Sequence, residues 1–151
     1  MPPTYFWILL LLSIGVHFGF ISLFDLKKII PSQYTIIEIT FGMILIILGI
    51  VFNIWADNLF KKERTTVKPF EKPSQLIVTG PFRFSRHPMY LGMAMILFGL
   101  AFFLGSLIAF IFPIIFMIIM ELLFISIEEK NLEKTFKNKF IDYKRQVRRW
   151  I

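Results

Sequence analysis

Four long apolar segments constrain the fold of this chain more than any other feature of its sequence. They cover approximately residues 5–24, 36–59, 88–104 and 107–127. Each is close to the length of about 20 residues that an α-helix needs to cross a bilayer. Because 56% of the residues are hydrophobic, the chain is also more apolar than a typical soluble domain. We therefore predict a single all-α integral membrane domain, residues 1–151, with about four transmembrane helices.

The basic residues are distributed unequally among the segments that connect these helices. The loop 60–87 holds seven lysines and arginines and the tail 128–151 holds eight, whereas the first loop holds only Lys27 and Lys28. Under the positive-inside rule, the loop 60–87, the tail and both termini lie on the cytoplasmic side. We attribute the net charge of +7 to contacts with anionic membrane lipids. Nucleic acid is not expected as a partner, because the basic residues border apolar segments.

The tail 128–151 is predicted to form an amphipathic helix at the membrane surface. Leu132, Phe136 and Phe140 recur at intervals of four residues, and Tyr143 extends the same face. A helix with one apolar face and lysines around the rest lies in the headgroup plane, with its apolar face inward.

The chain offers few residues for metal or thiol chemistry. It has no cysteine, which excludes disulfides, thiolate metal sites and a cysteine nucleophile. Its two histidines, His17 and His87, are far apart in the sequence, so no metal site is predicted.

The stretch "GPFRFSRHPMYLG" directly precedes and enters the third apolar segment. Pro88 suits the first position of a helix, so that His87 falls at or next to the N-cap. A helix N-terminus with Arg86 and His87 beside it can bind a carboxylate or a phosphate, and Tyr90 adds a hydroxyl and a ring. The sequence is equally compatible with arginines that only reach lipid headgroups and a histidine that only caps the helix.

A second group of chemically informative residues lies where the fourth apolar segment ends. Glu128 and Glu129 are adjacent there, and Glu121 precedes Glu128 by one heptad, so Glu121 and Glu128 are predicted to point roughly the same way. An ionised acid near the apolar interior of the bilayer costs desolvation free energy. Such an acid is therefore expected to face a cavity or an interaction partner. They could attract a cation, a ribose diol or an amine, although an ordinary charged helix end is the simpler alternative.

Both groups are predicted to meet at one cytoplasmic membrane surface. An anion-binding helix start beside paired acids suits a ligand that carries a carboxylate, an ammonium, a sulfonium and a ribose, which describes S-adenosylmethionine. The ordered set "GPFRFSRHPMYLG", an apolar hairpin and "IEEKNLEKTFKNKFIDYKRQV" also resembles the C-terminal half of the isoprenylcysteine carboxyl methyltransferase and phospholipid methyltransferase family. The resemblance covers approximately residues 76–147.

The resemblance implies a small helical membrane methyltransferase that binds S-adenosylmethionine in a pocket closed by the tail. A lipophilic acceptor would enter from the bilayer. Carried over by position, the residues that face the cofactor would be Arg86, His87, Tyr90, Glu128 and Glu129.

The same resemblance suggests roles in the methyl transfer. Arg83 or Arg86 would position an anionic acceptor by a bidentate contact, and Glu121 or Glu129 would take a proton from an amine acceptor. The tail departs from the family pattern Phe-Gly-x-x-Tyr, because Lys137 replaces the glycine and Phe140 replaces the tyrosine.

Two other classes of protein compete with the methyltransferase interpretation. Membrane sterol-type reductases bind NADPH and have a similar C-terminal pattern, but they commonly show His-Pro-Asn-Tyr, whereas Met89 stands here between the proline and the tyrosine. A non-catalytic membrane scaffold or subunit is the second alternative. The sequence leaves open whether the acceptor is an isoprenylcysteine carboxylate, a lipid amine or a small thiol, and it does not indicate the oligomeric state.

Overall fold

The computed structural model describes residues 8, 11–16, 36–63, 75–104 and 107–151. Within these residues the chain is helical and contains no strand, so the predicted all-α class is confirmed. Residues 11–16 form a short helical stretch. The elements that follow are α2 (Ile36–Lys62), η1 (Gly80–Arg83), α3 (Pro88–Leu104), η2 (Leu107–Phe110), α4 (Ile111–Ile119), η3 (Met120–Ile125), α5 (Ser126–Phe136) and α6 (Asn138–Gln146).

Two helices among the described residues are long and apolar enough to cross a membrane. They are α2 and the helix formed by α4, η3 and α5, Ile111–Phe136, whereas α3 is apolar but shorter. The predicted boundaries 88–104 match α3, and α2 continues three residues beyond the predicted end at 59. Most of the predicted first span, 5–24, lies outside the described residues. Residues 105–106 lie outside them too; there the pair Gly105-Ser106 predicts a tight turn between the third and fourth apolar segments. Four spans therefore remain a prediction.

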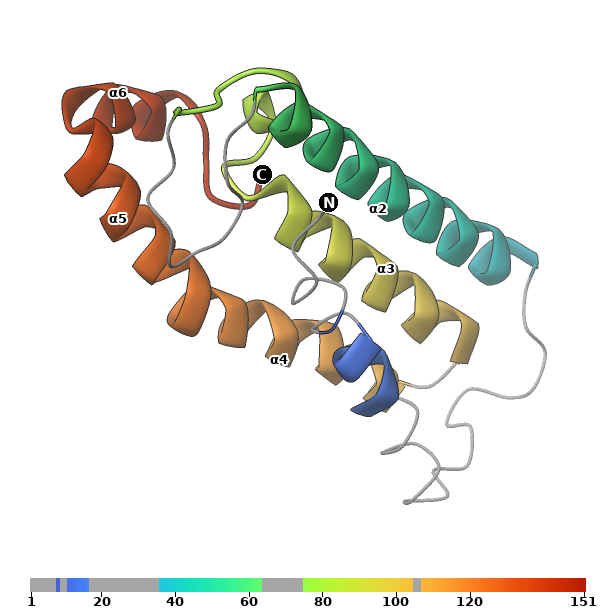
Figure 1. Ribbon diagram of the computed structural model, residues 1–151. Coiled ribbons are helices and arrows are strands. Elements are labelled where there is room, and N and C mark those ends of the chain that lie inside the picture. Colours follow the sequence, from blue (N-terminus) through green and yellow to red (C-terminus); the bar gives the residue numbers. More distant parts are fainter. Residues whose placement is uncertain (1–7, 9–10, 17–35, 64–74, 105–106) are drawn as a thin grey trace.

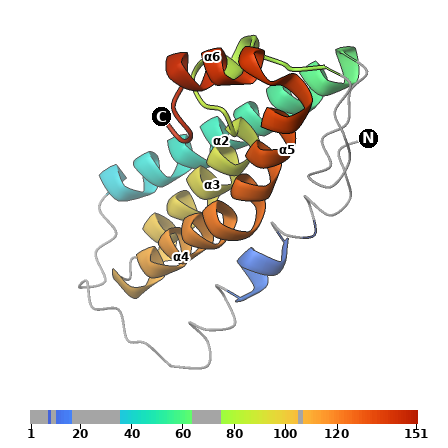
Figure 2. The ribbon, with the colours of Figure 1, turned by 90° about the vertical axis from the view of Figure 1, so that its left-hand side faces the viewer.

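Helices α2 and α3 run antiparallel and side by side (Figures 1 and 2). Glycines bring their backbones into direct contact at two points, Gly49 opposite Gly92 and Gly42 opposite Gly99. A Cβ atom on Gly49 would lie 2.5 Å from the carbonyl oxygen of Gly92, and one on Gly99 would lie 2.6 Å from that of Gly42. Small residues at helix interfaces allow this close approach in membranes, where lipid offers no hydrophobic force to hold helices together.

The helix from α4 to α5 lies against α3 at one end and diverges from it toward α6 (Figure 1). Large apolar side chains fill the space where the helices meet, and they include Met93 and Leu97 of α3 with Phe116 of α4 and Met120 of η3. The charged ends of the helices lie at the other end of the molecule, where α5 and α6 approach the turn before α3.

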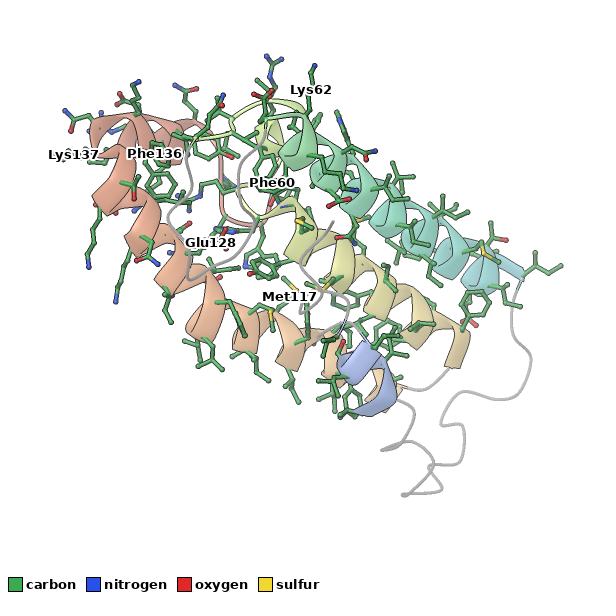
Figure 3. All side chains as sticks on the ribbon, viewed as in Figure 1. Phe60, Lys62, Met117, Glu128, Phe136 and Lys137 are labelled. Carbon is green, nitrogen blue, oxygen red and sulfur yellow. The ribbon has the colours of Figure 1, made fainter. Side chains whose placement is uncertain are left out.

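The tail differs from the predicted single surface helix. The fourth helix continues without a break to Phe136, and the chain then turns at Lys137, which has φ 48° and ψ −122°, before α6 begins. Figure 3 shows Lys137 at the corner between α5 and α6, with Phe136 directed toward the interior. Phe140 and Tyr143 are 1% and 7% exposed and belong to the protein core. The apolar face of the tail therefore packs on the protein itself.

Candidate active site

The turn before α3 is held in place by the C-terminal tail. The Tyr143 hydroxyl donates a hydrogen bond of 2.7 Å to the carbonyl oxygen of Phe82 in η1. Ser85, which is fully buried, accepts a hydrogen bond from the His87 amide and donates one of 2.9 Å to the Arg149 carbonyl. Burial raises the pKa of the Tyr143 phenol, so it remains a donor. These bonds fix the backbone that presents the Arg-His pair.

His87 lies between the two adjacent acids of α5. Its Nε2 atom is 3.3 Å from Oε1 of Glu129, and its Nδ1 atom is 3.6 Å from Oε2 of Glu128. The imidazole is only 5% exposed. Burial by itself lowers the pKa of His87, but the two carboxylates outweigh it and raise the pKa above its ordinary value of 6.5. Figure 3 shows Glu128 on the inner side of α5.

Glu129 is the most enclosed of the acids, with 3% of its surface exposed. Its Oε1 atom also contacts Arg86, whose Nη2 is 3.2 Å away. Its Oε2 atom accepts hydrogen bonds from Nε and Nη2 of Arg149, at 3.1 and 2.6 Å. A buried carboxylate is tolerated when charged hydrogen bonds compensate its lost hydration, and here both oxygens are compensated.

Glu121 joins the same cluster through the end of the chain. Arg149 Nη1 donates to its Oε1, and the Trp150 indole donates to its Oε2 at 3.0 Å. Glu121 lies in the π turn η3, where its carbonyl accepts from both the amide and the hydroxyl of Ser126. A π turn contains one residue more than an α turn. In the structure Glu121 shares Arg149 with Glu129, whereas Glu128 contacts His87.

Tyr90 completes the set of residues singled out in the sequence. It is 7% exposed, and its ring centroid lies 5.9 Å from that of His87. The structure thus brings together, at one end of the fold, all six candidates: Arg86, His87, Tyr90, Glu121, Glu128 and Glu129.

Sequence reasoning missed Ser85, Arg149 and Trp150. Arg149 was counted only as one basic residue of the tail, because no spacing rule shows that the tail returns to the acids. The sequence "RRW" at the end of the tail could have indicated this contact. Two arginines followed by a tryptophan, whose indole N–H is a donor, can bind a carboxylate near a membrane.

A cavity of ≈ 630 Å³ opens beside this cluster. Its polar side is formed by Arg86, Glu121, Arg149 and Trp150, and its apolar side by Ile114, Met117, Ile118 and Leu122. Cavities of several hundred Å³ are typical of small-molecule sites. In the described part of the chain, Nε and Nη1 of Arg86 are buried and have no hydrogen-bond partner. A buried guanidinium with unpaired donors beside a cavity favours an anionic ligand group.

The all-α fold, its two apolar helices of membrane-spanning length and its charged cluster at the helix ends define a small integral membrane protein with an enclosed polar site. A model of the phospholipid methyltransferase family matches residues 37–139, which is more than half of the chain. The chain belongs to this family of membrane methyltransferases, and the match includes all six candidate residues. A Haemophilus influenzae protein described as uncharacterized is 36% identical over 63 residues, which are 42% of this chain and all of that protein. No solved structure matches the chain.

Proposed function

We propose that the protein is an S-adenosylmethionine-dependent methyltransferase that acts on a lipophilic acceptor within the membrane. Membership of the phospholipid methyltransferase family supports the reaction class. The observation that carries the proposal is the buried Arg86, which has two nitrogens without a hydrogen-bond partner and borders a cavity that is charged on one side and apolar on the other.

The charged cluster has groups that fit S-adenosylmethionine. The positive charge of Arg86, whose Nε and Nη1 have no hydrogen-bond partner, suits the cofactor carboxylate. Glu128, whose side chain is 26% exposed, can accept from the ammonium or from the ribose hydroxyls. His87 and Tyr90 would lie beside these groups. When bound, the cofactor supplies a methyl group on a sulfonium that is already activated, so the protein mainly aligns the acceptor and excludes water.

The apolar side of the cavity suits an acceptor that arrives from the bilayer. Ile118 and Leu122 line the cavity and are 52% and 65% exposed, so the opening is continuous with a surface that lipid would cover. The acceptor could be an isoprenylcysteine-like carboxylate, a lipid amine or a small thiol. Arg86 would orient an anionic acceptor.

An amine acceptor must lose a proton during the transfer, and Glu121 is the better placed base. Glu121 lines the cavity and its side chain is 30% exposed, whereas the side chain of Glu129 is 5% exposed and is held by His87, Arg86 and Arg149. We assign Glu129 to organising the cofactor site and Glu121 to proton transfer.

The proposed topology has four spans, with residues 5–24 forming the first and with both termini and the site on the cytoplasmic side. The lysines of the loop 60–87 and of the tail support this orientation. Lys62, at the end of α2, and the tail helices lie at the same end of the molecule (Figure 3). A site at that end would open to cytosolic cofactor and to anionic lipid headgroups.

Calorimetry on protein purified in detergent tests this function. S-adenosylmethionine, S-adenosylhomocysteine and NADPH would be titrated into the wild type, His87→Ala, Glu128→Gln and Arg145→Gln. Arg145 is exposed and pairs with the exposed Asp142, so its variant is a control for a charge change away from the site. We expect the first two ligands to bind the wild type and the control, and to bind the other variants more weakly.

Other outcomes would replace the proposal by one of its rivals. Binding of NADPH instead would indicate a sterol-type reductase, and the absence of any binding would indicate a membrane scaffold. Glu128→Gln is preferred to a change at Glu129, because removing the buried Glu129 carboxylate would leave Arg86 and Arg149 uncompensated and could prevent folding.

A further inference from the structure

The last residues of the chain return to the turn before α3 and are anchored there through their backbone. The amide of Arg86 donates a hydrogen bond of 3.0 Å to the carbonyl of Arg148. The hydroxyl of the buried Ser85 donates to the carbonyl of Arg149. Because two consecutive carbonyls are bound, the direction in which the Arg149 side chain leaves the backbone is restricted.

The guanidinium of Arg149 spans two acids that belong to different helical turns. One arm contacts Glu121 in the π turn, and the other binds Glu129 through Nε and Nη2. Two carboxylates at a membrane boundary repel each other, and a shared guanidinium replaces that repulsion with charged hydrogen bonds. The hydrogen bonds to Glu129 are also the main reason that the pKa of Arg149 is raised, so the charge is permanent.

Trp150 restrains the second carboxylate oxygen of Glu121. Its indole N–H binds the second carboxylate oxygen, and its ring lines the cavity beside Arg149. Glu121, which is the acid proposed to take the acceptor proton, therefore has both oxygens positioned by the end of the tail. The family match ends at residue 139, so this contribution lies outside the matched region.

We propose that Arg149 is a positioning residue for the methyl transfer, holding Glu121 at the cavity and Glu129 against the Arg-His turn. The inference rests on the proposed function. It assigns to residues 148–150 the role of a closing strap that forms the polar wall of the cavity and sets the spacing of the two acids across the π turn.

Substitutions at Arg149 test the fork geometry separately from the charge. In Arg149→Gln both acids lose their shared partner, and we expect the Kd for S-adenosylhomocysteine to rise at least about tenfold, the effect of losing one strong charged contact. Arg149→Lys keeps the charge, but a lysine ammonium cannot bridge both acids as a fork does. It should recover part of the affinity, and Arg145→Gln should bind as the wild type does.

A second measurement follows the strap without any ligand. In a background with Trp7→Phe and Trp55→Phe, Trp150 is the remaining tryptophan. We expect acrylamide to quench its fluorescence more strongly in Arg149→Gln than in the parent, because the indole is released from Glu121. Arg145→Gln should leave the quenching unchanged.

The outcomes separate the two proposals. Unchanged quenching, or an unchanged Kd in Arg149→Gln, overturns the positioning role. Equal loss of affinity and of thermal stability in Arg149→Gln and Arg149→Lys would show a purely structural residue and also overturn it. Failure of the wild type to bind S-adenosylhomocysteine would instead refute the proposed function, while the quenching result would still show whether Arg149 holds the strap closed.

Discussion

Replacing Lys137 by glycine is expected to stabilise the fold. Lys137 joins α5 to α6 with φ 48° and ψ −122°, a region that glycine adopts readily and other residues adopt at a cost. Its side chain is exposed, so the substitution removes little packing. The strain of such a conformation is about 1–3 kcal/mol. The added freedom of glycine in the unfolded chain offsets about 0.5–1 kcal/mol of this gain, which leaves a net stabilisation of up to about 2.5 kcal/mol.

A glycine at Lys139 provides the matched control. Lys139 is also an exposed lysine, but it lies within α6, where glycine costs about 1 kcal/mol relative to a good helix former. Lys137→Gly and Lys139→Gly therefore remove the same side chain and should change stability in opposite directions.

Equilibrium unfolding in mixed micelles, with rising sodium dodecyl sulfate and circular dichroism as the signal, measures both changes. The free energy of unfolding should be higher than wild type for Lys137→Gly and lower for Lys139→Gly. Equal destabilisation by both glycines would refute the argument, because it would mean that the turn at 137 stores no strain.

Three further changes test other parts of the fold. Gly49→Ala should destabilise by about 1–3 kcal/mol, because the new Cβ would lie 2.5 Å from the carbonyl oxygen of Gly92. Tyr143→Phe should cost about 1–3 kcal/mol in the same unfolding assay, since it leaves the buried carbonyl of Phe82 without its donor. The pKa of His87 is raised in the folded state, so its stabilising effect is complete below pH 6.5 and is lost as the pH rises through the folded-state pKa. Thermal scans should therefore show the wild-type midpoint falling above pH 6.5, with a smaller fall in His87→Asn.

Each of these predictions has an outcome that contradicts it. Gly15→Ala is the control for the helix contact, because a Cβ there would meet nothing within 4 Å; equal costs at positions 15 and 49 would rule out backbone contact. A Tyr143→Phe protein as stable as wild type would mean that the phenol bond adds nothing. Identical pH profiles for the wild type and His87→Asn would show that the imidazole does not titrate with folding.

Much of the helical framework follows from the hydropathy of the sequence. The ends of α3 were predicted because Pro88 favours a helix start and a glycine-serine pair follows the apolar segment. The topology also predicted that the Arg-His turn and the acids lie on one side, and in the structure His87 is 3.3 Å from Glu129. These features are visible in the sequence because they depend on local propensity and on the length of a bilayer.

The finer geometry could not be obtained in this way. Nearly every residue from 117 to 127 is apolar, so the pattern fits an α turn and a π turn equally well, and the one-residue shift that aligns Glu121 with Glu129 is hidden. The break at Lys137 was indicated only by the family pattern, which has a glycine at this position, because lysine itself is not a turn signal. Arg149 depends on a long-range return of the chain, which carries no periodic signal.

The glycine contacts between α2 and α3 have a mechanical consequence. Where backbones touch at two points seven residues apart, the side chains beside these contacts, such as Ile46 and Ile96, have little room to change rotamer, so we expect the pair to move as one rigid body. The helix from α4 to α5 meets α3 through Phe116 and Met120, which can adjust. A bulky acceptor can therefore widen the cavity only by displacing this helix, which carries the acids away from the Arg-His turn. Under the proposed function, acceptor size and cofactor affinity are therefore expected to be coupled, with each ligand changing the binding of the other by the same factor.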